Sequence, residues 1–139
     1  MAMKTSKVTR FEYETLAALR YALRQFLRFS ENAARSAGVP PQQHQALLAI
    51  KGFPGRDRVT LGELAERLQI RHHSAVGLAD RLVARGLVTR EADTKDRRQV
   101  YLALTAQGEN ALEKLSVPHK EQLRRLGPHI ESLLKRLRG

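Results

Sequence analysis

The stretch from Leu61 to Leu104 constrains this chain most, because its hydrophobic pattern changes from a helical period to a period of two. Thr60 is followed three residues later by Glu63, a spacing typical of a capping box at a helix N-terminus. Apolar residues then recur at helical spacing, stop near Gln69 and resume from Ala75 to Leu82. Two short helices joined by a turn of three or four residues predict a helix-turn-helix.

Two extended segments follow, separated by a highly charged run. Gly86 is the expected end of the second helix, and Leu87–Thr89 form one predicted strand. Val100, Leu102 and Leu104 alternate at period two and predict the other strand. The charged residues 90–98 between them are too polar for a core and predict a hairpin tip. The combination predicts a winged helix-turn-helix fold, α+β in class and mostly α.

The outward side of the second predicted helix, residues 72–85, is the candidate surface for base readout. In a helix-turn-helix the N-terminal part of this helix enters the major groove, which demands small or hydrogen-bonding groups in its first turn. The alternative is a solvated surface helix, and Arg81 could equally form an internal ion pair with a neighbouring acid. The candidate residues are Arg71, His72, His73, Ser74, Val76, Gly77 and Arg81.

The predicted hairpin tip offers a second candidate contact with DNA. Lys95, Arg97 and Arg98 gather there, and Arg is attracted to the negative potential of a narrow minor groove. Asp96 lies among them, although an acid does not itself favour DNA binding. Its geometry favours a bidentate ion pair that holds an Arg side chain in place. The alternative is a charged turn that is simply solvated.

The same stretch resembles the core of the MarR family of bacterial transcription regulators. The resemblance rests on RGLV at residues 85–88, the DxR of Asp96 and Arg98, and the LTxxG of Leu104, Thr105 and Gly108, and covers about a third of the chain. It implies that Arg98 contacts the minor groove and Arg97 a phosphate. The contact positions of the family also fall on Val76 and Gly77. The position of Arg71 usually holds a small capping residue, so Arg71 departs from the pattern.

Helices are predicted on both sides of this core. Thr9 and Glu12 form a second capping-box pattern, and the helix that follows ends near Gly38. Another helix is expected from Pro41 to about Lys51, followed by a short strand at Arg56–Val59. After the hairpin, Thr105 is the expected cap of a helix that Pro118 either ends or kinks. Gly127-Pro128 predicts a break before a last helix.

The first and last helices carry apolar stripes that a chain of this size does not cover. The first helix would be about 40 Å long at 1.5 Å per residue. In the family resembled, these terminal helices interleave into a two-fold dimer. The predicted interface residues are Leu16, Leu19, Leu23, Leu126, Ile130, Leu133, Leu134 and Leu137. We therefore expect one winged-helix domain over residues 1–139, with dimerisation helices at 1–38 and 105–139 and a DNA-binding part at 41–104.

Composition supports a polyanionic partner and excludes several other classes of protein. The net charge of +11 favours nucleic acid, and no apolar run has the ~20 residues that a membrane span needs. The absence of cysteine and of a secretory pattern fits the cytoplasm. Adjacent side chains on a helix point ~100° apart, so His72 and His73 do not form a metal site. No catalytic motif is present, and we expect neither an enzyme nor a cofactor.

The sequence thus predicts a homodimeric regulator of transcription, a repressor, that binds a pseudopalindromic site in duplex DNA. The resemblance also implies release by a small, often aromatic, ligand. Tyr13, Tyr21, Phe26 and Phe53 could line such a site, but aromatic residues at helical spacing are more often core, so the site stays unassigned. Two alternatives remain open: a basic architectural protein that binds DNA without sequence preference, and a protein-interaction module that has lost DNA binding.

Overall fold

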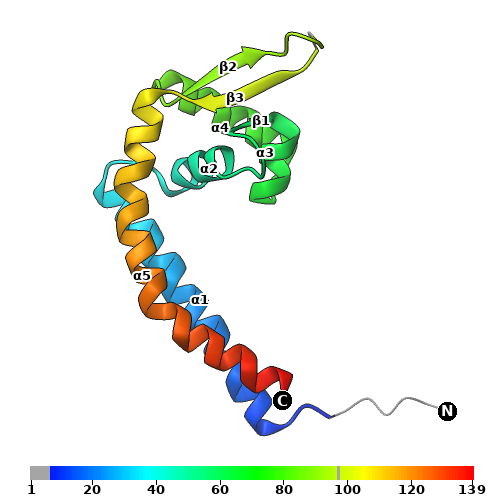
Figure 1. Cartoon of the computed structure of the whole chain (residues 1–139), viewed down its shortest axis with the longest axis vertical. Helices are drawn as coiled ribbons and strands as arrows, with labels where there is room; N and C mark the ends of the chain where they lie inside the picture. The colour runs from blue at the N-terminus through cyan, green and yellow to red at the C-terminus, as the bar shows by residue number, and fades with distance from the viewer. Residues whose placement is uncertain (1–6, 97) are drawn as a thin grey trace, which may run out of the picture. The chain divides into compact units, whose positions relative to one another are not determined.

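The structure is a computed structural model that describes residues 7–96 and 98–139. It divides into two compact units, which we call the winged-helix unit (Glu31–Val117) and the helix-pair unit (the residues up to Ser30 together with Pro118–Gly139). The elements, labelled in Figure 1, are α1 (Arg10–Ser36), α2 (Pro41–Lys51), β1 (Arg58–Thr60), α3 (Leu61–Leu68), α4 (His72–Ala84), β2 (Val88–Ala92), β3 (Val100–Leu104) and α5 (Ala106–Arg138).

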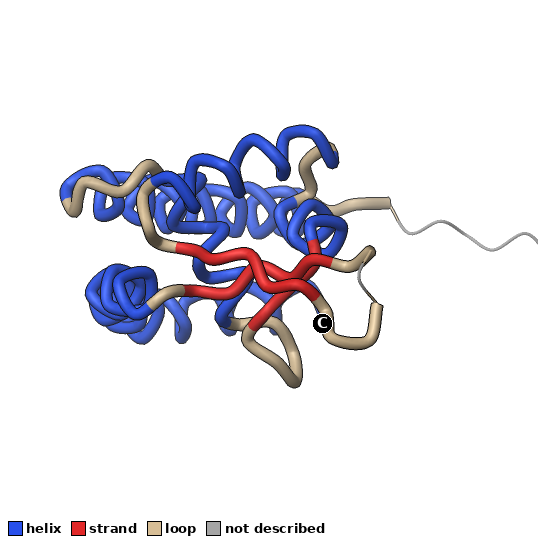
Figure 2. Tube along the Cα trace, turned by 90° about the horizontal axis from the view of Figure 1, so that it is seen from above, coloured by secondary structure: helices blue, strands red, loops and turns tan. Residues whose placement is uncertain are grey.

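An antiparallel sheet of order β1-β3-β2 organises the winged-helix unit (Figure 2). Leu102 lies on the central strand, opposite Val59 of β1, and both side chains are fully buried. Helices α2, α3 and α4 supply most of the rest of the core, so alternate residues of the sheet have an apolar partner on one face only. The buried cluster comprises Ala46, Leu47, Ile50, Val59, Leu64, Leu78, Ala79, Leu82, Leu87, Val88, Leu102 and Leu112.

Both predicted capping boxes are confirmed. At α3 the Glu63 amide donates to Thr60 Oγ1 over 3.1 Å, and the Thr60 amide donates to Glu63 Oε1 over 2.9 Å. The same reciprocal bonds join Thr9 and Glu12 before α1. Each pair satisfies backbone donors that have no partner inside the helix. The first turn of each helix is therefore fixed by local sequence.

The end of α4, the start of β2, the end of β3 and the start of α5 meet at one junction. Gly86 has a φ of +72°, and the Leu87 amide donates back to the Leu82 carbonyl over 3.0 Å, which ends α4. The Thr105 amide donates to the Leu87 carbonyl over 3.0 Å, and its hydroxyl donates to the Gly86 carbonyl over 2.6 Å. A Cβ on Gly108 would lie 2.0 Å from that Leu87 oxygen. The LTxxG pattern therefore has a structural cause.

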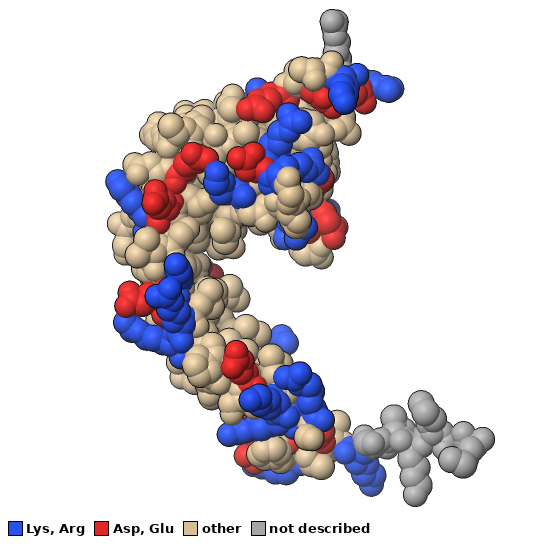
Figure 3. Space-filling model, viewed as in Figure 1, with Lys and Arg blue, Asp and Glu red and all other residues tan. Residues whose placement is uncertain are grey.

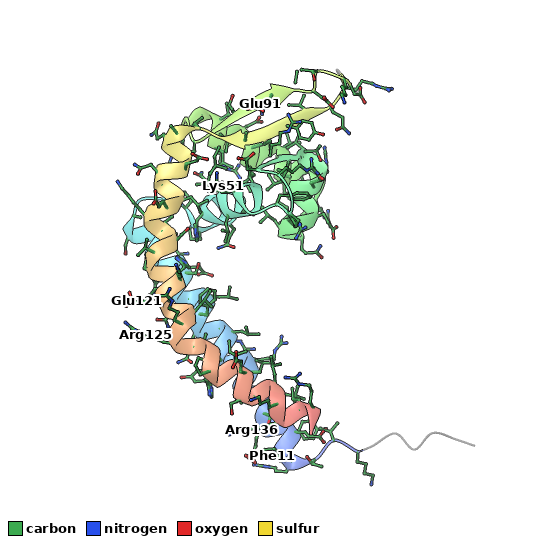
Figure 4. All side chains as sticks on the ribbon, in the orientation of Figure 1. Phe11, Lys51, Glu91, Glu121, Arg125 and Arg136 are labelled. Atoms are coloured by element: carbon green, nitrogen blue, oxygen red, sulfur yellow. The ribbon has the colours of Figure 1, made fainter. Side chains whose placement is uncertain are left out.

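The helix-pair unit consists of the first part of α1 and the last part of α5 in antiparallel arrangement (Figure 1). At one end His119 Nε2 lies 2.8 Å from Ser30 Oγ, and its ring meets the edges of Phe26 and Phe29. At the other end the Arg136 guanidinium carbon lies 5.7 Å from the Phe11 ring centroid (Figure 4). The small residue Ala22 is buried between these ends.

The predicted break at Gly127-Pro128 is wrong, because α5 runs without interruption through Pro118 and Pro128. Besides removing a backbone hydrogen bond, a proline crowds the Cβ of the residue before it, and Gly127 has none. The half-buried or buried residues Leu126, Ile130 and Leu133 also keep one helical phase across Pro128. One lost backbone hydrogen bond is offset by continued packing of that stripe. Of the two outcomes left open for Pro118, the helix does not end there.

The wing differs from the prediction in its extent. Strand β2 continues to Ala92, so Arg90 and Glu91 belong to a strand and not to the tip. Val100 alternates with Leu102 and Leu104 at period two, but it is 38% exposed because the hairpin there extends beyond the core. The predicted strand before α3 exists, shifted to Arg58–Thr60. Its register is set by pairing with β3, which the local sequence does not specify.

We predict that Gly108→Ala destabilises the protein by about 1–3 kcal/mol, because the new methyl group would overlap the Leu87 carbonyl oxygen. Thermal and urea unfolding followed by circular dichroism, at one fixed protein concentration, would measure the change. Gly62→Ala is the matched control: it also adds a methyl group to a helical glycine, but its nearest contact is an ordinary 3.9 Å to Thr60 Oγ1. Equal stability of the two variants would contradict the close approach at Gly108.

Candidate nucleic-acid interface

Helix α4 has one face in the core and the other toward solvent. Ala75, Leu78, Ala79 and Leu82 are fully or almost fully buried. His72, His73 and Arg81 are exposed, and Ser74, Val76 and Gly77 are half-buried. A helix needs about 100° of apolar surface to pack against a core, and these four buried residues supply it. His72, His73 and Arg81 therefore lie on the outward face, and Ser74, Val76 and Gly77 lie at its border.

The N-terminal end of α4 lacks a side-chain cap. Arg71 occupies the N-cap position with extended backbone angles and makes no capping hydrogen bond. The first amides of a helix have no partner within it, and together with the helix dipole they attract anionic groups. The substitution of Arg for a small capping residue thus places an exposed cation beside uncapped amides. This end of α4 is chemically suited to a phosphate.

The other end of α4 is anchored by an arginine that the sequence did not single out. Arg85 donates from Nη1 to Gln43 Oε1 over 3.0 Å and from Nη2 to the Gly38 carbonyl over 3.1 Å. Gln43 is itself buried in α2. These bonds join the C-terminus of α4 to the segment that precedes α2. In the sequence, the only sign of these hydrogen bonds is the Arg of RGLV, which does not indicate that Gln43 and Gly38 are its partners.

The neighbouring residues Asp80 and Arg81 have different surroundings. Asp80 forms an ion pair with Arg90 of β2. The internal ion pair that the sequence left open at this end of α4 therefore involves Asp80 and not Arg81. Arg81 turns back along the helix, and its Nη1 would lie 3.4 Å from a Cβ on Gly77. It has no ion pair among the described residues. Gly77 therefore leaves space that the Arg81 guanidinium occupies.

The hairpin tip is held by backbone and side-chain bonds around Asp96. Its Oδ1 accepts from the Arg98 amide over 3.0 Å and lies 3.4 Å from Arg98 Nε. With Arg98 the expected bidentate pair is not formed, because a single carboxylate oxygen receives both donors. The Arg98 side chain nevertheless remains 94% exposed. The Lys95 side chain is exposed as well, and Arg97 lies outside the described residues.

The positive charge is distributed unevenly between the two units. The winged-helix unit has 13 Lys and Arg against 10 Asp and Glu, whereas the helix-pair unit has 12 against 4. Figure 3 shows acidic and basic side chains interspersed on the visible face of the winged-helix unit. In the part of the chain that is described, Arg20, Arg24 and Arg28 of α1 have no ion pair. The strongest basic excess therefore lies outside the helix-turn-helix.

The predicted dimer residues all lie on the helix-pair unit but differ in exposure. Leu16, Leu23 and Leu134 are exposed, with Leu23 at 45%. Leu19, Leu126, Ile130 and Leu137 are half-buried. Leu133 is buried within the protomer and serves the contact between α1 and α5. Further exposed apolar side chains occur at Phe11, Tyr13, Tyr21, Leu27 and Leu123. Single exposed apolar residues are normal on a protein surface, but this unit has more of them than such scattered residues account for.

The structure also bears on a metal site, a membrane-spanning helix and a ligand site. Among the described residues, no three His, Asp or Glu side chains come together in a way that could hold a metal ion. No helix in the described ranges has the length and hydrophobicity needed to cross a bilayer. Of the four aromatic residues considered for a ligand site, Tyr13 and Tyr21 are exposed, Phe26 contacts His119, and Phe53 lies beneath Arg56 and Arg67.

The comparisons with known proteins agree on one family. The sequence profile of the MarR family matches residues 37–99. Over 83 residues the chain is 32% identical to the HTH-type transcriptional repressor MdtR of Bacillus subtilis (strain 168). That alignment covers 60% of this chain and 52% of MdtR, so the chain matches about half the length of this curated relative.

Solved structures share the fold over nearly the whole chain. A MarR family protein from Bacillus stearothermophilus superposes with a TM-score of 0.78 at 22% identity, covering 96% of this chain and 94% of that one. The F27L mutant of MepR from S. aureus, solved bound to an oligodeoxyribonucleotide, gives 0.66 at 17% identity and covers 87% and 93%. These likenesses establish a winged helix with flanking long helices.

The position of α3 depends on Glu63, whose ionisation can be tested. Burial alone raises the pKa of the Glu63 carboxyl, but the Thr60 amide and the Arg56 guanidinium outweigh it and hold the pKa below its ordinary value of 4.5. A depressed pKa in the folded state stabilises the protein above pH 4.5, and that contribution is lost as the pH falls through the folded value.

We predict that wild type is more stable than Glu63→Gln at neutral pH and that the difference shrinks as the pH falls below about 4.5. Urea unfolding at a series of pH values between 3 and 7 would measure both proteins. Glu66→Gln, on the same helix, is the control, since Glu66 makes no ion pair among the described residues. A pH-independent difference for Glu63→Gln would show that the Thr60 and Arg56 contacts do not favour the ionised carboxylate.

Proposed function

The MarR family profile matches residues 37–99 of this chain, and we propose that the protein is a homodimeric transcription regulator of that family, a repressor, that binds duplex DNA. Helix α4 contacts base edges in the major groove, and the wing contacts the adjacent minor groove. The observation that carries the proposal is the outward face of α4. The helix N-terminus has no side-chain cap, the face carries no acid except the ion-paired Asp80, and the opposite face packs in the apolar core.

The proposed contacts follow from exposure and charge. Arg71, His72 and His73 begin the outward face of α4, and Val76 can reach a thymine methyl group. Arg98 extends from the tip of the wing, where Asp96 fixes its backbone. The DNA-bound MepR mutant has the same fold, which supports DNA as the partner of these surfaces. The name of MdtR, a repressor, supports repression as the outcome.

A dimer is part of the proposal because it gives the contacts their spacing. Two copies joined through the exposed apolar face of the helix-pair unit would present two α4 helices to one duplex. Half-sites about 34 Å apart, one turn of DNA, would match such a dimer and would form a pseudopalindrome. A small ligand that releases the dimer from DNA fits this scheme, and its binding residues remain unassigned.

We predict that the protein binds the DNA upstream of its own gene at least tenfold more tightly than a scrambled duplex, as in a specific complex. Arg98→Ala should weaken that binding about tenfold, or ~1.4 kcal/mol, and reduce the slope of log K against log salt by about 1. Fluorescence anisotropy at several salt concentrations would measure both effects. Arg35→Ala is the charge-matched control, because Arg35 is an exposed cation on α1.

The same titration separates the competing functions. Unchanged affinity of Arg98→Ala would remove the wing from the interface. Equal, salt-sensitive binding to both duplexes would favour an architectural DNA-binding protein, a second candidate that the 12-to-4 basic excess of the helix-pair unit supports. Absence of binding to any duplex would favour the protein-interaction module. Each result points to a different function.

We predict that Leu23→Glu converts the dimer to a monomer, because it places a charge on a side chain that is 45% exposed in the protomer and central to the proposed interface. Sedimentation equilibrium at matched concentrations would measure the oligomeric state. Leu48→Glu is the control, since Leu48 is 47% exposed but lies on α2. A monomeric wild type, or a dimeric Leu23→Glu protein, would contradict the proposed interface.

A further inference from the structure

Five side chains on the winged-helix unit form a continuous series of contacts between guanidinium groups and aromatic rings, which we call the arginine–aromatic ladder. In order it contains Arg67, Phe53, Arg56, Tyr101 and Arg58. The guanidinium carbons of Arg67 and Arg56 lie 4.9 and 4.5 Å from the Phe53 ring centroid. Those of Arg56 and Arg58 lie 5.6 and 4.1 Å from the Tyr101 centroid. All four distances are within the range of a cation–π contact.

Carboxylates fix two of the three arginines. Arg56 pairs with Glu63, the residue that also closes the capping box of α3. Arg58 Nη1 lies 3.9 Å from Glu91 Oε2 of β2, the strand on which Figure 4 labels Glu91. The ladder therefore connects the turn after α2, helix α3 and all three strands. It is a network across elements and not a solvated row of charges.

The sheet register explains why Tyr101 is central to the ladder. Tyr101 lies on β3, directly opposite Thr60 of β1 and Glu91 of β2. Opposite residues share a sheet face, so these three side chains lie in one row. Arg58 is the diagonal neighbour of Tyr101 and spans its ring to reach Glu91. One stacked ring thus joins β1 to the outer strand of the wing.

The outer part of the wing has little else to hold its direction. Of the two wing strands only Val88 and Leu102 are buried, and every residue from Thr89 to Ala92 is exposed. On the opposite face, Arg90 pairs with Asp80 of α4. A two-stranded hairpin is only marginally stable by itself, so its outer part depends on contacts with neighbouring elements. Its orientation must come from such side-chain contacts.

We propose that the arginine–aromatic ladder is a positioning element that fixes the direction of the wing relative to α4, with Tyr101 as its central residue. This inference rests on the proposed function, in which Arg98 and α4 contact DNA together. Tyr101 itself touches no DNA in this scheme. It acts by holding the wing in one orientation. Arg98 is then directed to the minor groove, and the wing does not have to sample other orientations before binding.

A double-mutant cycle tests this role. In the Tyr101→Leu background, which keeps an apolar side chain and removes the ring, Arg98→Ala should weaken DNA binding less than twofold, against about tenfold in wild type. Arg81→Ala, on α4, should weaken binding by the same factor in both backgrounds. Tyr101→Phe keeps the ring and should restore the full effect of Arg98→Ala. An unchanged effect of Arg98→Ala in the Tyr101→Leu background would overturn the proposal.

Amide hydrogen exchange without DNA provides an independent measurement. Tyr101→Leu should accelerate exchange in β2 and the outer part of β3 at least tenfold, while the amides of α3 and α4 keep their protection. Tyr101→Phe should exchange like wild type. Unchanged exchange in the wing would overturn the ladder as its support, and uniform acceleration would show that Tyr101 serves general stability and would overturn it equally.

The two measurements separate failure of the ladder from failure of the proposed function. The double-mutant cycle requires only that the protein binds DNA. Binding without sequence preference would therefore contradict the proposed regulator, but the coupling between Tyr101 and Arg98 would still test the ladder. Absence of binding to any duplex would overturn both the proposed function and the role of the ladder in DNA contact. Loss of the native circular dichroism spectrum in Tyr101→Leu would indicate general destabilisation and would also count against the proposal.

Discussion

The close approach of Gly108 to the carbonyl oxygen of Leu87 is the constraint on which the winged-helix unit depends. That oxygen accepts the Thr105 amide and leaves no space for a Cβ on Gly108. The Thr105 hydroxyl binds the Gly86 carbonyl at the same time and accepts the Gly108 amide. Four elements are therefore joined within a few residues, and the base of the hairpin is closed. Helix α5 can begin only where β3 has returned to the end of α4.

Features that depend on a few neighbouring residues could be predicted from the sequence. The capping boxes at Thr9 and Thr60, the glycine end of α4 at Gly86 and the buried face of α4 are all local, and all are confirmed. The resemblance to the MarR family was recognisable from the residues of the junction, because only glycine fits at position 108 and Thr105 must both cap and donate. A pattern of this kind is specific since each residue has a separate steric or hydrogen-bonding reason.

Features that depend on distant partners could not be predicted. The continuity of α5 depends on packing along α1, which outweighs the preference of proline to end a helix. The exposure of Val100 depends on how far the hairpin extends past the core, and a period of two does not contain that information. The pairs of Asp80 with Arg90 and of Arg58 with Glu91 required the register of three strands. The candidate contacts with DNA remain predictions for the same reason, since their partner is outside the chain.

Net charge is a poor guide to binding on this fold, because most carboxylates of the winged-helix unit hold cations in place. Glu63, Asp80 and Glu91 pair with Arg56, Arg90 and Arg58, and Asp96 orients the backbone of Arg98. Within the described residues, Arg71, Arg81 and Lys95 have no such partner. The cations thus divide into one group that fixes the wing and the helices and another that is available to phosphate. The paired group sets where the unpaired group points, so acids that lower the net charge can still favour DNA binding.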